Sequence, residues 1–203
     1  MRPWPFIPLL AALCCPLACA ADESITVCYN YGCASQQAVV YTEAQLREIH
    51  ALLQQARDAA GEREQISLAI GRLLKWAGQQ TPISADRGGN YSDHGVNGRM
   101  DCIDHSTTTT RLLKMLEARG MLRWHRVLPP KQRLRFVLFQ HYSALIEEIA
   151  PPRSAPSGAA DDEEEANKRR FVVDTWYFDN GHPAAVFPLE DWLNGDDPEV
   201  INE

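Results

Sequence analysis

The sequence lacks an excess of basic residues: 20 Lys and Arg stand against 27 Asp and Glu, which gives a formal net charge of -7. An acidic chain has no bulk electrostatic attraction for nucleic acid or for an anionic membrane surface, so we expect neither as a partner. The sequence also lacks internal repeats and an apolar run long enough for a transmembrane helix. These absences leave a globular protein, and its 203 residues suit one domain with a substantial core.

The N-terminus has the pattern of a secretory signal peptide. Arg2 provides a positive start, an apolar stretch runs from Phe6 to Leu17, and Ala18-Cys19-Ala20 fits the small-x-small cleavage pattern. This pattern predicts a signal peptide over residues 1–20 and a periplasmic or secreted protein. The alternative is a lipoprotein that carries a lipid anchor on Cys19.

Cleavage after residue 20 would leave Cys28, Cys33 and Cys102 in the mature chain. Cys28 and Cys33 flank a short segment that can turn at Gly32, and in an oxidising compartment they are natural disulfide partners. A metal pair is the alternative, although the sequence lacks the second Cys pair that would complete a zinc set. Cys102 is then an odd thiol, which is either a buried apolar residue or a reactive one.

Hydrophobic periodicity divides the mature chain into helices followed by strands. Thr42 and Gln45 have the capping-box spacing at the start of one helix, and Asp101 is the expected N-cap of another that reaches Gly120. The remaining predicted segments are a helix around residues 66–78, a loop over 81–100, strands over 122–128, 134–149 and 170–177, and a short strand at 185–187. This order predicts an α+β fold in which residues 21–203 form a single domain.

A low-complexity segment separates two of the predicted strands. Residues 151–168 contain Pro, Ser and Ala followed by the acidic run 161–165. Such a composition cannot bury enough apolar surface to offset the entropy of ordering. We therefore predict an acidic disordered insertion at about 151–168.

Three residues form a candidate catalytic triad. Cys102 begins a predicted helix, where free N–H groups and the positive end of the helix dipole stabilise a thiolate. His141 and Asp174 lie in successive predicted strands, so antiparallel pairing can place a base beside a carboxylate that orients it. The backbone N–H of Cys102 would form an oxyanion hole with a second donor, for which Asn97 and Gln140 are candidates.

The order of three short motifs resembles the transglutaminase-like superfamily. The motifs are Asp-Cys-Ile-Asp-His from Asp101, His-Tyr-Ser-Ala-Leu-Ile-Glu from His141, and Phe-Val-Val-Asp-Thr-Trp from Phe171. The first motif is most similar to the bacterial transglutaminase-like cysteine proteinases, which are periplasmic. The resemblance covers residues 97–177 and implies a papain/transglutaminase-like fold, with N-terminal helices and a Cys-bearing helix packed on an antiparallel sheet.

The resemblance also implies roles for individual residues. Cys102 would be the nucleophile, His141 the base and Asp174 the orienter of a hydrolase or acyl-transferase. Such an enzyme acts on peptide or isopeptide amide bonds through a thioester, so a protein or peptide is the expected substrate. The family branch also holds calcium on acidic residues beside the Cys, which Asp101 and Asp104 match. No other cofactor is required.

Other readings of the same residues stay open. Ile103 stands where the proteinase branch tends to have Glu, which departs from the calcium pattern. Cys102 and His105 are three residues apart on one helical face, which allows a rival dyad or, with His94, a zinc site. The alternative to an enzyme is a non-catalytic or metal-binding periplasmic protein on the same fold.

Overall fold

The computed structural model describes residues 21–89, 93–135, 139–150 and 159–198. The predicted signal peptide, with Cys19, lies outside the described residues. The elements are β1 (Glu23–Tyr29), β2 (Ser35–Tyr41), α1 (Glu43–Leu53), α2 (Ala59–Gly78), the 3-10 helix η1 (Pro82–Ala85), α3 (Cys102–Ala118), β3 (His125–Arg135), β4 (Phe139–Glu148), α4 (Ala159–Asn167), β5 (Arg170–Asp174), β6 (Ala185–Pro188) and α5 (Leu189–Asn194). The predicted α+β class is confirmed. Within the described part of the chain, no helix combines the length and hydrophobicity needed to cross a membrane.

The element order corrects one expectation, because the chain does not begin with helices. Strands β1 and β2 form an antiparallel hairpin ahead of α1, in register from Glu23 opposite Tyr41 to Tyr29 opposite Ser35. The physical reason is a half-buried face: on β2, Val39 and Tyr41 are fully buried while Val40 between them is 45% exposed, and Val27 on β1 is also fully buried. A two-stranded hairpin is marginal alone, so its stability comes from this packing.

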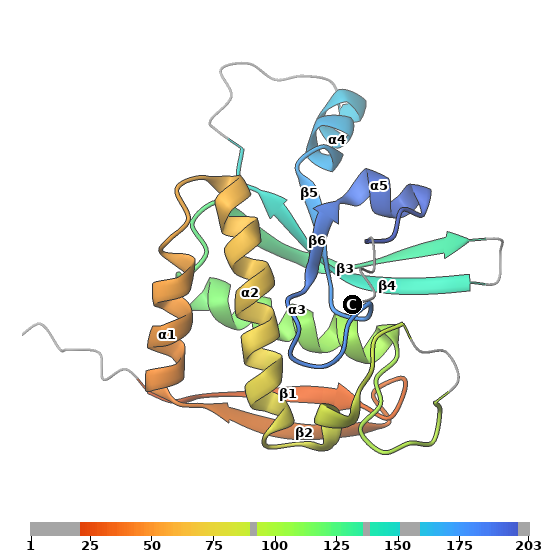
Figure 1. The fold of residues 1–203 in the computed structure, drawn as a ribbon. Coiled ribbons are helices and arrows are strands. Elements are labelled where there is room, and N and C mark those ends of the chain that lie inside the picture. The colour runs from red at the N-terminus through yellow and green to blue at the C-terminus, as the bar shows by residue number, and fades with distance from the viewer. Residues whose placement is uncertain (1–20, 90–92, 136–138, 151–158, 199–203) are drawn as a thin grey trace, which may run out of the picture.

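Helix α3 lies at the centre of the fold (Figure 1). It contacts the hairpin through β1 on one side and the sheet β3-β4-β5-β6 through β3, β4 and β5 on the other. All neighbouring strands in that sheet are antiparallel. The core joins these layers through buried residues of α2 (Ile66, Ile70, Leu73), α3 (Leu112, Leu113, Leu116) and the sheet (Val127, Ala144, Ile146, Val173). Both the start of α3 and the ends of β4 and β5 are therefore fixed to one core.

The predicted helix starts follow from local capping chemistry. Thr42 caps α1 by a complete capping box with Gln45, as the spacing indicated. The second helix begins earlier than its apolar period suggested, because Asp58 caps it by accepting from the N–H of Gly61 at 2.7 Å.

The acidic insertion contains a helix, which corrects part of its predicted disorder. Residues 151–158 lie outside the described residues, whereas Ala159–Asn167 forms α4. Ala and Glu are strong helix formers, and the acidic run finds basic partners nearby. Lys168 Nζ lies 3.2 Å from Glu164 and 2.9 Å from Glu165, and Arg170 Nη1 lies 2.7 Å from Glu163.

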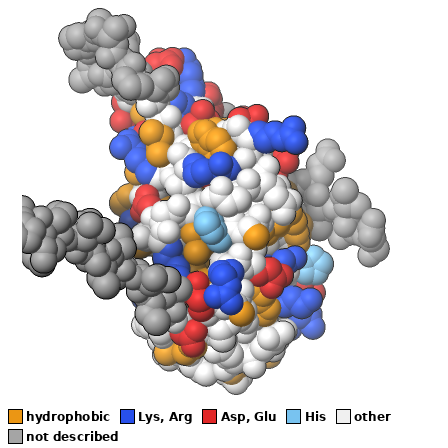
Figure 2. Space-filling model, turned by 90° about the vertical axis from the view of Figure 1, so that its left-hand side faces the viewer, with side chains coloured by type: hydrophobic (Ala, Val, Ile, Leu, Met, Phe, Trp, Pro, Cys, Tyr) orange, Lys and Arg blue, Asp and Glu red, His pale blue; other side chains and the backbone are white. Residues whose placement is uncertain are grey.

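The acidic excess is not concentrated on the face that carries α1. Figure 2 shows basic and acidic side chains interspersed there, with scattered hydrophobic ones. Ion pairs account for part of this pattern, since Arg119 contacts Glu43 at 2.8 Å and Arg72 contacts Glu48 at 2.5 Å. The described residues on this face therefore provide no single-sign field for steering a charged partner.

Candidate active site

The candidate site begins where α3 begins. Asp101 is the N-cap, and its Oδ1 accepts from the N–H groups of Ile103 at 3.0 Å and Asp104 at 2.9 Å. Cys102 is therefore the first residue of the helix, as predicted. Its N–H has no acceptor within its own helix and no hydrogen-bond partner among the described residues. The Cys102 side chain is partly buried against Trp176, Tyr177 and Ala185.

Strands β4 and β5 bring His141 to Asp174. The two strands pair from Glu147 opposite Arg170 to Ala144 opposite Val173, so His141 lies just past the paired segment, near the end of β5. His141 Nε2 is 2.7 Å from Asp174 Oδ2, and the two side chains are 12% and 1% exposed. The other oxygen of Asp174 accepts from the N–H of Trp176 at 3.1 Å, which fixes the carboxylate.

The Cys102 side chain lies close enough to the same imidazole to affect its pKa. Burial by itself lowers the pKa of His141, but the hydrogen bond to Asp174 and then the interaction with Cys102 outweigh it and raise the pKa from 6.5 to about 9. At neutral pH the ring is therefore an imidazolium between a carboxylate and a sulfur.

Aromatic rings enclose His141. Its ring centroid lies 5.0 Å from that of Trp176, 5.8 Å from that of Tyr177 and 5.8 Å from that of Trp192. Arg133 stacks 4.8 Å from the Trp192 ring centroid, and its Nη2 donates to the Tyr177 hydroxyl at 3.1 Å. Such rings exclude water from the His141–Asp174 pair and stabilise its cation.

Trp192 and Arg133 were missed from the sequence. Trp192 lies on α5, far along the chain from His141, and only the antiparallel register places Arg133 directly opposite His141 on β3. A pairing prediction for β3 and β4 is the one signal that could have found Arg133.

The two candidate second oxyanion donors are placed differently. The Asn97 side-chain carbonyl accepts from Asn30 Nδ2 at 3.2 Å, on the loop before α3. Gln140 is exposed and presents its backbone carbonyl to the Cys102 sulfur, 4.0 Å away. Among the described residues, neither the Asn97 nor the Gln140 side-chain amide is hydrogen bonded to Cys102 in these contacts. The backbone N–H of Cys102 itself has no acceptor there and is free to donate to an oxyanion.

His105, on α3, contacts a different set of buried residues. Its Nδ1 lies 2.9 Å from the Thr175 hydroxyl, and its Nε2 lies 3.0 Å from Asp86 Oδ2. Asp86 also accepts from the N–H of Met100 at 2.8 Å. Both ring nitrogens of His105 thus face other partners, which argues against the rival dyad and the zinc site. His94, the third zinc candidate, packs edge-on against the ring of Tyr31, at 5.4 Å between centroids.

The proposed calcium ligands are already engaged by N–H groups. Asp101 Oδ2 accepts from Gly32 at 2.9 Å, while Asp104 accepts from Cys33 at 2.6 Å on Oδ1 and from Tyr31 at 2.8 Å on Oδ2. Burial raises the pKa of Asp104 to about 6, although the N–H of Cys33 opposes that rise. Together with the helix caps, every oxygen of the two carboxylates has a donor.

The predicted Cys28–Cys33 disulfide is confirmed. In the described residues the only cluster with a metal-ligand composition combines these cysteines with Asp104. Its two sulfurs are bonded to each other, so they are not free to bind a metal as thiolates.

Comparisons with known proteins find no matching family model, no matching curated protein and no matching solved structure. The geometry of Cys102, His141 and Asp174 and the motif resemblance are therefore the observations that bear on function.

Proposed function

We propose that the protein is an exported cysteine hydrolase or acyl-transferase of the transglutaminase-like class, acting on peptide or isopeptide amide bonds. The observation that carries the proposal is the position of the His141 imidazole beside a carboxylate and near a thiol. His141 Nε2 lies 2.7 Å from Asp174 Oδ2, and the Cys102 side chain is close enough to the same ring to raise its pKa. Nucleophile, base and orienter in this arrangement are the requirements of covalent amide chemistry.

The fold and the disulfide support the class and the location. A Cys-bearing helix packs on an antiparallel sheet whose neighbouring strands β4 and β5 carry the His and the Asp. This arrangement agrees with a papain/transglutaminase-like architecture. A disulfide is typical of proteins outside the reducing cytosol, so it supports periplasmic or secreted placement.

The chemistry follows from the positions of the three side chains. The Cys102 thiolate attacks the amide carbon, and the carbonyl π electrons move to oxygen, where the Cys102 N–H can donate to the oxyanion. The tetrahedral intermediate collapses, the C–N bond breaks, and the protonated His141 delivers its proton to the leaving amine. A thioester on Cys102 remains.

The acceptor decides the second half of the reaction. With water, His141 removes a proton, the oxygen attacks the thioester carbon, and the products are a carboxylic acid and the restored thiolate–imidazolium pair. With a primary amine, the same steps give a new amide. Asp174 keeps the ring oriented throughout and balances its positive charge.

We expect activity without calcium. A calcium site at Asp101 and Asp104 would have to displace N–H donors from carboxylates that also cap α3 and bind the loop of residues 31–33. Those contacts give the two residues a structural role beside Cys102.

The test combines a thiol probe with an amide substrate. Iodoacetamide alkylation of Cys102 is followed by peptide mass mapping, and hydrolysis of a library of fluorogenic peptide amides is measured in parallel. We expect rapid alkylation near neutral pH, amide cleavage by the wild type, and loss of cleavage in Cys102→Ser. His141→Ala should slow both reactions.

His50→Ala is the matched control, because His50 is an exposed histidine on α1, remote from Cys102 in the chain, and should change neither rate. A Cys102 that reacts only after denaturation would refute the proposal. Adding a primary amine to the cleavage reaction distinguishes transamidation from hydrolysis by the mass of the product.

A further inference from the structure

The disulfide closes a loop with an unusual backbone. Four consecutive residues have positive φ angles: Asn30 (67°), Tyr31 (66°), Gly32 (62°) and Cys33 (56°). Only glycine adopts this region without steric cost, so three of the four are held in a conformation that an L-residue avoids. Such strain persists where surrounding contacts over-determine it, and it concentrates at functional sites.

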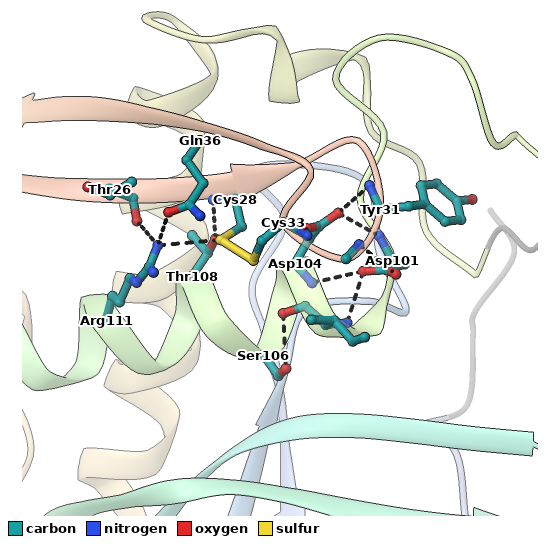
Figure 3. The surroundings of a disulfide bond; sticks show 12 residues. Thr26, Cys28, Tyr31, Cys33, Gln36, Asp101, Asp104, Ser106, Thr108 and Arg111 are labelled. Atoms are coloured by element: carbon teal, nitrogen blue, oxygen red, sulfur yellow. Dashed lines mark hydrogen bonds between the residues drawn. A yellow bond between two sulfur atoms is a disulfide. The ribbon is translucent and has the colours of Figure 1, made fainter.

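The strained backbone turns successive N–H groups toward the start of α3 (Figure 3). Tyr31 and Cys33 donate to the two oxygens of Asp104 at 2.8 and 2.6 Å, and Gly32 donates to Asp101 at 2.9 Å. Asp101 and Asp104 are the capping box of the helix whose first residue is Cys102. The loop therefore holds the residue just before Cys102 and a residue two positions after it.

Asn30 holds the chain that enters the helix. Its N–H donates to the Arg99 carbonyl at 2.7 Å, and its side-chain oxygen accepts from the N–H of Gly98 at 2.8 Å. Cys28, at the start of the loop, donates its N–H to the hydroxyl of Thr108 at 3.0 Å, six residues after Cys102 on α3. The loop thus contacts the segment before Cys102, the capping residues beside it and the helix after it.

The contacts also have an electrostatic consequence. The negative charges of Asp101 and Asp104 disfavour ionisation of the Cys102 thiol at the same turn of the helix, because like charges repel at short range. Asp104 is fully buried, so water does not screen it, and the N–H groups of the loop supply the compensating positive dipoles. Loss of the loop would leave the sulfur beside poorly compensated negative charge.

We propose that the disulfide-closed loop Cys28–Cys33 is a positioning device for Cys102: it fixes the helix start and offsets the charge of Asp101 and Asp104. The inference deepens the proposed function, on which it rests for the role of Cys102. The loop residues are positioning residues, because they act through α3 and do not contact the reacting atoms.

The experiment measures Cys102 alkylation by iodoacetamide across pH in a Cys28→Ser/Cys33→Ser double variant, with peptide mass mapping to isolate Cys102. We expect the rate near neutral pH to fall at least about fivefold and the pH of half-maximal rate to rise, while circular dichroism still shows cooperative unfolding. A merely stabilising disulfide would leave the pH profile of a folded protein unchanged.

A second variant keeps the disulfide and both carboxylates and changes an uncharged anchor of the loop. Asn30→Ala removes the side-chain oxygen that accepts from the N–H of Gly98 and places Ala at a φ of 67°, so we expect a slower alkylation rate, as in the double variant. Arg119→Gln is the matched control: it removes a hairpin contact to α3, the 3.2 Å bond to Glu23, at the C-terminal end of the helix. It should leave the alkylation rate within about twofold of wild type.

The outcomes separate the two proposals. Unchanged alkylation in the folded double variant and in folded Asn30→Ala overturns the positioning role, and so does loss of cooperative unfolding in both, which would make the loop a general stabiliser. A wild type that alkylates rapidly but cleaves no amide overturns the proposed function, while the loop effect on alkylation still decides the positioning role.

Discussion

Replacing Asp174 with Asn tests the central contact of the site. The change keeps the size of the side chain and removes the charge that lies 2.7 Å from His141 Nε2. The rise of the His141 pKa from 6.5 to about 9 corresponds to about 3 kcal/mol of preference for the imidazolium. Asp174 supplies the larger share of the attractive interactions, so most of that preference should be lost.

Two consequences should be measurable in a pH–rate profile of amide cleavage. For the wild type, activity that needs protonated His141 should decline as pH rises through about 9. In Asp174→Asn this alkaline limb should move down by more than about one pH unit, toward the ordinary histidine value. The maximal rate should also fall by about 10²- to 10⁴-fold, because an amide does not support the cationic ring.

The control is Asp179→Asn, which alters a half-exposed carboxylate five residues later that accepts from the N–H of Gly88. Its profile should overlay that of the wild type. An alkaline limb that stays near pH 9 in Asp174→Asn would contradict the argument, because the His141–Asp174 contact would then not set the protonation of the ring. Proton NMR of the His141 ring gives the same answer without a substrate.

Three further predictions follow from other contacts. Glu62→Ala should lower the free energy of unfolding in urea by about 3 kcal/mol, because buried Glu62 accepts from the Arg123 and Trp124 N–H groups and from His125; wild-type stability would contradict it. Gly88→Ala should reduce cleavage and stability, because a Cβ there meets the Tyr177 and Phe178 backbone, and unchanged kinetics would disprove that close packing. Folding raises the pKa of His141 above 6.5, so the stability that its charged ring contributes should be complete below about pH 6.5 and lost as pH rises through about 9. Urea denaturation of the wild type and of His141→Ala across pH checks this.

Local signals in the sequence were sufficient for the parts of the site that local chemistry determines. Thr42 with Gln45 and Asp101 with Asp104 are capping pairs within four residues of each other, so the starts of α1 and α3 could be read directly. Cys28 and Cys33 are equally close in sequence. Each of these features depends on neighbours along the chain and on little else.

The rest depended on contacts between distant segments. The β1–β2 hairpin carries alternating buried residues such as Val39 and Tyr41, but its stability comes from packing on α3. Helix α4 forms from an acidic run whose charges are met by Lys168 and Arg170 at its end. The ring of Trp192 reaches His141 from the far end of the chain. Composition alone carries none of this information.

The hairpin changes how the site as a whole should be understood. The triad motifs lie between residues 97 and 177, yet the carboxylates next to Cys102 find donors at residues 31–33. A fragment that begins after residue 41 would keep Cys102, His141 and Asp174 and lose every one of those donors. It would also expose apolar surface of α3 that β1 covers. The end of α3 that carries Cys102 is therefore surrounded jointly by the N-terminal hairpin, whose loop donates to the carboxylates of Asp101 and Asp104, and by β4 and β5, which carry His141 and Asp174.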